Sequence, residues 1–156
     1  MKAAAPVLCA VDFSMDSEVA LLWAARQAER EDARLVVLHV VHDPASSPGF
    51  YRKPEAGWLR PMEEVAQEMF GEFLDGVRER NPGAVGLGRI ETMLRTGLPA
   101  GRITEAAEEI GAGLVVVGSR GRTGLPHIML GSVAQRVAQT AAAPVTVVKA
   151  PDSAEP

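Results

Sequence analysis

Three glycines and a serine occur at fixed intervals after the apolar run "LVVVG" at residues 114–118. Gly118 ends the run, Gly121 follows after two residues, and Gly131 and Ser132 follow after nine more. Glycines let a backbone approach a ligand closely. A helix that begins at Gly131-Ser132 offers free amides and a hydroxyl to an anion. The spacing therefore indicates phosphate binding.

The charges around these glycines favour the same interpretation. Arg120 and Arg122 lie between them, and each can fork onto phosphate oxygens. Residues 110–151 contain no Asp or Glu, although the chain has 20, and they also carry Arg136 and Lys149. A simpler alternative stays open: the glycines form only a tight turn and a helix start, and the arginines are solvated.

Other chemistries have little support in the sequence. No lysine lies near the glycines, so there is no P-loop motif, and "GSRGRTG" is not a G-x-G-x-x-G motif. Hydrolysis needs a general base or an oriented water, and this region offers only His127. Asp12 follows the first apolar run at the same expected sheet edge. It either meets a base or ribose, or hydrogen-bonds the next turn.

Composition limits the class of protein. A chain of 156 residues with 47% hydrophobic residues suits one globular domain. A net charge of −4 makes nucleic acid an unexpected partner. No run approaches about 18 apolar residues, so we expect no membrane span. Asp12 interrupts the first apolar run, which suits a first strand better than a signal peptide, and the single Cys9 suits a reducing compartment. We expect a cytoplasmic protein.

Valine-rich runs alternate with helical patterns along the chain. Continuous apolar runs of this kind are typical of strands buried on both faces of a parallel sheet. The expected strands cover 7–11, 35–41, 89–94, 114–118 and 144–149. The expected helices are one that follows Asp16 and Ser17, and three more at 61–80, 99–111 and 132–143. The order predicts an α/β fold, a single-domain open parallel sheet with helices on both faces.

One connection is too long for a simple link. Residues 42–60 carry three prolines and two glycines, and Tyr51 is among their few side chains suited to contacts. We expect either a lid that nucleotide orders or a plain insertion.

The spacing Gly118-x2-Gly121-x9-Gly131-Ser132 resembles the G-2x-G-9x-G-(S/T) pattern of ATP-binding universal stress proteins. Similarity extends over "VLCAVDFSMDSEVAL", "LVVLHVV", "RTGLPAGRI" and most clearly 114–148. The resemblance implies a Rossmann-like, adenine nucleotide alpha hydrolase-like fold with five strands in the order 3-2-1-4-5. It also implies a homodimer.

The resemblance assigns a role to each matching position. It implies that Asp12 and the backbone of Val40 face the adenosine and that Val117 and Gly118 lie beside the ribose. It implies that the phosphates are held by the residues of the glycine region, which are Gly121, Gly131, Ser132 and the Val133 backbone. Arg120 and Arg122 would add charge. The ligand that the resemblance implies is ATP, with Mg²⁺ carried by its phosphates.

These observations predict a nucleotide-binding domain over residues 1–150 and a frayed tail over 151–156. We expect an ATP-binding regulatory stress-response protein with little or no hydrolysis. The alternatives are a slow ATP hydrolase or nucleotide-transfer enzyme, and an interaction module that needs no nucleotide. The strand at 144–149 would lie at a sheet edge, and an exposed apolar edge invites pairing. We therefore expect the homodimer to form through this strand.

Overall fold

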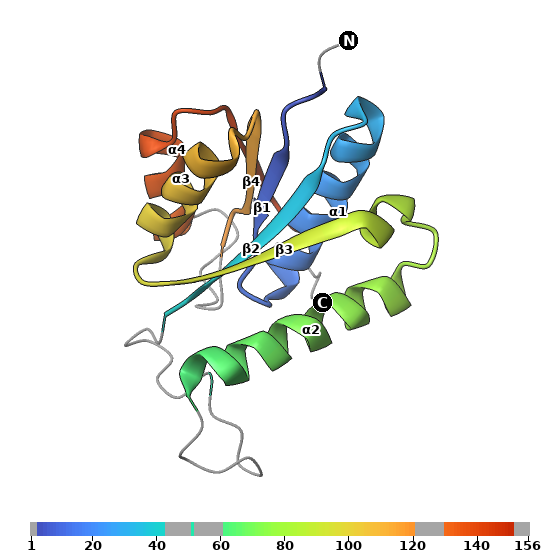
Figure 1. Ribbon diagram of the computed structural model, residues 1–156, viewed down its shortest axis with the longest axis horizontal. Coiled ribbons are helices and arrows are strands. Elements are labelled where there is room, and N and C mark those ends of the chain that lie inside the picture. Colours follow the sequence, from blue (N-terminus) through green and yellow to red (C-terminus); the bar gives the residue numbers. More distant parts are fainter. Residues whose placement is uncertain (1–2, 43–50, 52–60, 121–129, 152–156) are drawn as a thin grey trace.

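Five parallel strands form one twisted sheet at the centre of the protein (Figure 1). The structure is a computed structural model that describes residues 3–42, 51, 61–120 and 130–151. The strand order is β3-β2-β1-β4-β5, so the predicted order 3-2-1-4-5 and the α/β class are confirmed. The strands are β1 (Val7–Ala10), β2 (Leu35–Val41), β3 (Ile90–Thr96), β4 (Leu114–Gly118) and β5 (Val145–Val148).

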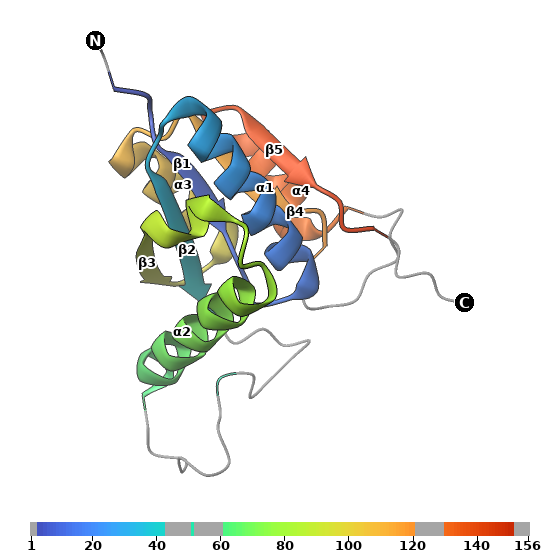
Figure 2. The same cartoon turned by 90° about the vertical axis from the view of Figure 1, so that its right-hand side faces the viewer.

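Helices cover both faces of the sheet, as the sequence predicts (Figures 1 and 2). One face packs against α1, α2 and a short 3-10 helix, η2, while the other packs against α3 and α4. The helices are α1 (Met15–Glu31), α2 (Met62–Arg80), η2 (Val85–Arg89), α3 (Pro99–Ile110) and α4 (Ser132–Thr140). None of the described helices is long and apolar enough to cross a membrane.

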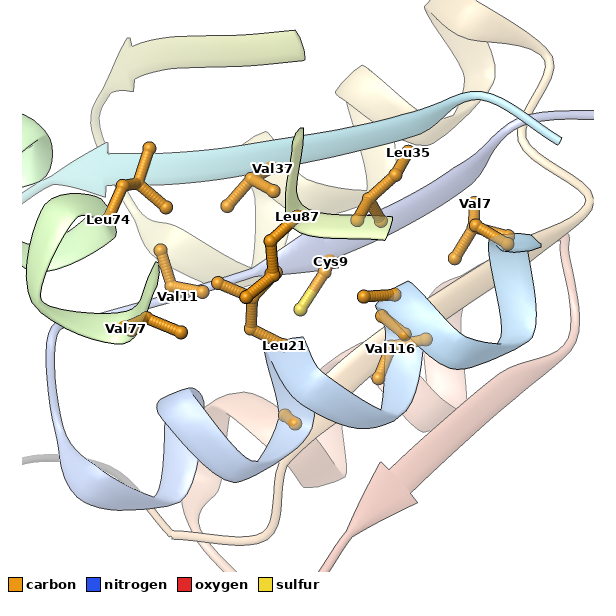
Figure 3. Close-up of a cluster of buried hydrophobic side chains, with 14 of the residues drawn as sticks. Val7, Cys9, Val11, Leu21, Leu35, Val37, Leu74, Val77, Leu87 and Val116 are labelled. Atoms are coloured by element: carbon orange, nitrogen blue, oxygen red, sulfur yellow. The ribbon is translucent and has the colours of Figure 1, made fainter. Parts of the chain in front are cut away.

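The core on the α1 face is built from the valine-rich strands (Figure 3). Cys9, Leu21 and Val37 are fully buried there. Burial raises the pKa of the Cys9 thiol because the apolar surroundings disfavour the thiolate. Cys9 is therefore a small core residue.

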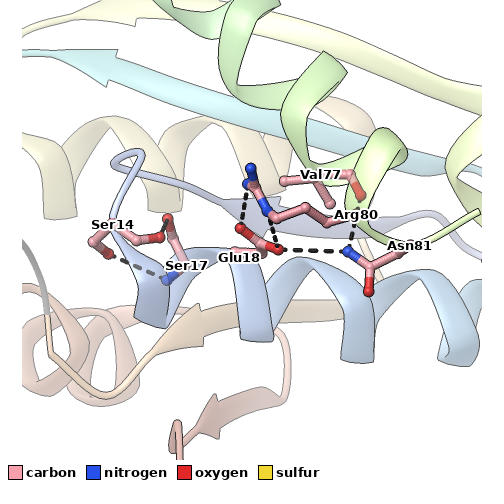
Figure 4. A network of polar contacts seen from close by, with 6 residues as sticks. All are labelled: Ser14, Ser17, Glu18, Val77, Arg80 and Asn81. Carbon is pink, nitrogen blue, oxygen red and sulfur yellow. Dashed lines mark hydrogen bonds and ion pairs between the residues drawn. The ribbon is translucent and has the colours of Figure 1, made fainter. Parts of the chain in front are cut away.

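Helix α1 begins earlier than the sequence predicts. Asp16 and Ser17 are good N-cap residues, but the cap is Ser14, whose hydroxyl accepts a hydrogen bond of 3.2 Å from the Ser17 amide (Figure 4). Asp16 consequently lies in the first turn of α1, where its carboxylate accepts hydrogen bonds from Arg120.

Helix α2 buries one face against the sheet. Val65 and Val77 are buried, whereas Met62 at its start is 38% exposed. Phe70 and Leu74 contribute the largest buried side chains of this helix. Their spacing of three or four residues links Phe70 and Leu74 to Val77 on one helical face.

Strand β5 forms an edge of the sheet, next to β4. Pro144 and Val148 accept hydrogen bonds from Val115 and Ser119 on the β4 side. Because alternate residues of a strand direct their backbone groups to opposite sides, the backbone groups of Val147 point away from β4. This edge is where the sequence predicts a second copy, and the homodimer stays a prediction.

Candidate functional site

The strand order places a switch point between β1 and β4. The chain proceeds from β1 toward β2 on one side and later adds β4 on the other side of β1. In open parallel sheets, ligands bind beyond the carboxyl ends of the strands at such a point. The residues that follow β1 and β4 therefore form the candidate site.

The two ends of the segment between β4 and α4 are joined to each other. The amide of Gly131 donates a hydrogen bond of 2.7 Å to the carbonyl of Ser119. The amide of Ser119 donates one of 2.9 Å to the carbonyl of Val148 in β5. The start of α4 is thereby held at the carboxyl end of β4.

The N-terminus of α4 has no side-chain cap. Gly131 is the N-cap residue and Ser132 is the first residue of the helix, so the Ser132 hydroxyl does not cap α4. Ser132 and Val133 are exposed. The amides of Ser132, Val133 and Ala134 have no acceptor within the part of the chain that the structure describes. An anion at this helix end would accept from these amides and interact favourably with the helix dipole.

Ser119 is a candidate site residue that the sequence interpretation missed. It is only 3% exposed, yet its hydroxyl makes no hydrogen bond to any described residue. The other buried polar residues, Asp16, Ser17 and His39, are all hydrogen-bonded. A buried hydroxyl without a protein partner is normally satisfied by a ligand or by ordered water. Its position directly after Gly118 was the available signal.

Arg120 forms an ion pair with Asp16. Its Nε and Nη2 donate to the two carboxylate oxygens of Asp16 at 2.9 and 3.2 Å. The region without acidic residues in the sequence thus receives a carboxylate from the first turn of α1. Sequence reasoning missed this partner because the two residues are 104 positions apart.

Asp12 hydrogen-bonds the turn that follows it, which was one of the two alternatives. Its Oδ1 accepts from the amide of Ser14 at 3.0 Å and from the Ser14 hydroxyl. Oδ2 has no hydrogen-bond partner among the described residues. The carboxylate therefore orients the cap of α1 through Oδ1.

The backbone of Val40 faces the space beyond the end of β1. The amide of Val11 donates to the carbonyl of Leu38, so the backbone groups of Leu38 and, two residues later, Val40 point toward the β1 side. Asp12 follows Val11 there. Asp12 and the backbone of Val40 are thus brought to one corner of the sheet edge.

Tyr51 reaches the same corner. Its hydroxyl lies 3.5 Å from the carbonyl oxygen of Val40 and 2.9 Å from Nε2 of the buried His39. Nδ1 of His39 lies 2.8 Å from the carbonyl oxygen of Val11, which can only accept. His39 therefore donates through Nδ1 to the Val11 carbonyl, and its Nε2 lies within hydrogen-bond distance of the Tyr51 hydroxyl. The rest of the predicted lid, apart from His42, lies outside the described residues.

Some predicted site residues are not described. Gly121, Arg122 and His127 fall within 121–129, which lie outside the described residues. The Val117 side chain is packed in the core on the α3 face, so its backbone is what remains for a ligand. Within the described residues no group of three or more His, Cys, Asp and Glu side chains is placed to hold a metal ion.

Comparison with known proteins identifies the family. The sequence profile of the universal stress protein family matches residues 5–149. The chain belongs to this family. Among curated universal stress proteins, one from Mycolicibacterium smegmatis is 38% identical over 144 residues, which cover 92% of this chain. The universal stress protein YxiE from Bacillus subtilis is 36% identical over 148 residues, which cover 92% of this chain and 97% of YxiE.

The relatives differ in length. The matched region is 45% of the mycobacterial relatives that match first, so this chain spans about half their length. It spans nearly all of YxiE. The longer relatives therefore support the family of this chain, but their activities and partners as whole proteins are not transferred to it.

Solved universal stress proteins share the fold and include nucleotide complexes. One in complex with cAMP has a TM-score of 0.65, is 25% identical, and covers 95% of this chain and 98% of its own. One from Archaeoglobus fulgidus in complex with dAMP has a TM-score of 0.63 and is 25% identical over 95% of this chain and all of its own. Both ligands are adenine nucleotides.

Proposed function

We propose that this universal stress protein is an ATP-binding regulatory protein. The observation that carries the proposal is the uncapped N-terminus of α4 at the switch point, with exposed Ser132 and three amides without a described acceptor. The cAMP and dAMP complexes of related structures support an adenine nucleotide as the class of ligand.

In this proposal, the residues after β1 and β2 contact the adenosine. Asp12 uses the carboxylate oxygen that is not bonded to Ser14, and it accepts from a ribose hydroxyl. The backbone of Val40 faces the adenine. Val117 and Gly118 contribute backbone beside the ribose, and the lack of a Cβ at Gly118 lets this backbone pack closely against Asp16 of α1.

The phosphates lie against the start of α4. The amides of Ser132 and Val133 and the Ser132 hydroxyl donate to phosphate oxygens, and Gly131 lets the start of α4 pack against Ser119 and Arg120. Gly121 and Arg122 belong to the same proposed cradle, on the basis of the sequence motif. Mg²⁺ would come with the phosphates, since no described residue set supplies a metal site of its own.

We expect little hydrolysis. Of the two carboxylates described at this edge, Asp16 is paired with Arg120, and Asp12 is bonded to Ser14 and lies on the ribose side in this proposal. Neither is placed as a ready general base. We therefore propose that ATP changes the stability or the partners of the protein, in a cytoplasmic homodimer, rather than serving as a substrate.

Thermal unfolding with ATP, AMP, cAMP and GTP, with and without Mg²⁺, tests the proposal. A nucleotide at 100 times its dissociation constant should raise the unfolding free energy by about 2.7 kcal/mol. Adenine nucleotides should do so and GTP should not. If no adenine nucleotide raises the melting temperature, the proposal is wrong. Phosphate release faster than roughly one per second would instead indicate an enzyme.

A further inference from the structure

The contact between Asp16 and Arg120 crosses the switch point. Arg120 follows β4 and Asp16 lies in the first turn of α1, so the pair joins the two elements that flank the proposed ligand. Both guanidinium contacts are within 3.2 Å, and the side chains are only 20% and 10% exposed. A forked, largely buried arginine–carboxylate pair has a well-defined geometry.

Asp16 also touches the other end of the same short segment. A Cβ atom added to Gly118 would lie 3.1 Å from the carbonyl oxygen of Asp16 and 3.2 Å from its carbonyl carbon. Residues 118–120 are therefore held against one residue of α1 at both ends, by backbone packing at Gly118 and by the ion pair at Arg120.

Residues 118–120 also contact the start of α4. Ser119, between the two contacts, accepts the hydrogen bond of 2.7 Å from Gly131. A Cβ added to Gly131 would lie 3.3 Å from the Ser119 carbonyl oxygen and 3.5 Å from the Cα of Arg120. A shift of residues 118–120 away from α1 would thus displace the N-cap of α4.

We propose that Asp16 and Arg120 form a positioning pair, in which Asp16 holds Arg120 so that residues 118–120 fix the N-terminus of α4. Arg120 acts through this contact and not as a phosphate ligand. If Arg120 moved to a phosphate, the Asp16 carboxylate would stay largely buried without its partner, which is costly. The consequence for ligand affinity rests on the proposed function, but the positioning itself does not.

Amide hydrogen exchange at Gly131 tests the positioning without any nucleotide. Asp16→Asn and Arg120→Gln should each raise the exchange rate at Gly131 by about tenfold relative to the amide of Val37, which reports global unfolding. The double variant should raise it by less than the product of the two single effects, because the Asp16–Arg120 contact is common to both changes. Unchanged exchange at Gly131 in Asp16→Asn would overturn the proposal, whether or not a nucleotide binds.

Glu18→Gln is the matched control. Glu18 lies in the same first turn of α1, but it accepts hydrogen bonds from Arg80 and Asn81 at the end of α2 (Figure 4). Removing this carboxylate should leave the relative exchange at Gly131 unchanged. An equal rise in Glu18→Gln would show that any weakening of α1 produces the effect, and would contradict a specific pair.

The dissociation constants of adenosine, AMP and ATP separate positioning from phosphate binding. If the pair positions the site, Arg120→Gln should raise the dissociation constants of AMP and ATP by a similar factor, since the binding of both depends on the start of α4. Asp16→Asn should weaken them as well. If Asp16→Asn instead tightens ATP, or Arg120→Gln weakens ATP much more than AMP, then Arg120 binds phosphate and the inference is wrong. If the unsubstituted protein binds none of the three, the proposed function fails while the exchange experiment still decides the positioning.

Discussion

The carbonyl of Ser119 accepts a hydrogen bond of 2.7 Å from the amide of Gly131, which lies twelve positions later in the sequence. This contact explains why Gly118 and Gly131, the first and third glycines of the motif, lie close together although they are far apart in sequence. It brings an uncapped helix N-terminus to the carboxyl end of β4. The proposed phosphate site follows from that juxtaposition.

Ser132→Ala tests the hydroxyl of this site. Because Ser132 is the first residue of α4 and not its cap, the change should leave the melting temperature nearly unaltered. Loss of one hydrogen bond to a charged phosphate costs about 1.5–3 kcal/mol, which corresponds to a roughly ten- to hundredfold lower ATP affinity. Calorimetry measures this affinity. Thr140→Ala is the control, since that hydroxyl lies at the other end of α4 and donates to the carbonyl of Arg136. Equal affinities in both variants would remove Ser132 from the site.

Asp12→Asn separates the two roles of Asp12. The amide oxygen of asparagine can still accept from Ser14, so the start of α1 should be kept. Loss of the negative charge should weaken the binding of adenosine and of ATP to a similar extent, because both ligands make the ribose contact. Calorimetry measures both affinities. Asp12→Ala should in addition lower stability by about 1 kcal/mol through the weakened helix start. Full affinity in Asp12→Asn would show that the carboxylate serves only the turn.

The sheet was predictable because its signals are local. Runs such as 35–41 and 114–118 are continuous, apolar and rich in valine, and their bounds agree with β2 and β4. Pro99 and Gly111 likewise mark the two ends of α3. The strand order came from the family resemblance, not from these runs.

The site was predictable only in part because its contacts are long-range. Neither the Asp16 carboxylate beside Arg120 nor the Tyr51 hydroxyl beside His39 can be read from spacing. The sequence instead favoured Asp16 as a helix cap, because Asp is a common cap residue. Ser14 occupies that position since its own hydroxyl is oriented by Asp12.

Val147→Pro tests the predicted homodimer at β5. Proline at this position removes an amide that points away from β4, so the pairing with β4 should persist while a partner strand loses a donor. Sedimentation should show a dimer for the parent and a monomer for the variant. Thr146→Pro is the contrasting change, because it removes an amide on the β4 side and should lower stability. A parent that is monomeric at micromolar concentration would contradict the prediction.

Stability should depend on pH through Arg34 and Glu91. The Arg34 guanidinium donates to both carboxylate oxygens, and this hydrogen bonding lowers the pKa of Glu91. A lowered pKa in the folded state adds stability above the ordinary value of 4.5, and this gain is lost as the pH falls through the lowered pKa. Glu91→Gln should therefore melt below the parent near neutral pH. The difference in melting temperature between Glu91→Gln and the parent should vanish in acid and become smaller in high salt. A difference that does not depend on pH would contradict a stabilising Arg34–Glu91 ion pair.

Backbone amide NMR during an ATP titration tests the central claim most directly. The account predicts that saturation shifts the amide signals of Ser132 and Val133 most, together with those of Gly118 and Ser119, while the amides of α2 near Arg80 stay unchanged. Saturable binding with shifts confined to α2 or to the β3 edge would place the nucleotide elsewhere and contradict the account. So would the absence of any shift at millimolar ATP.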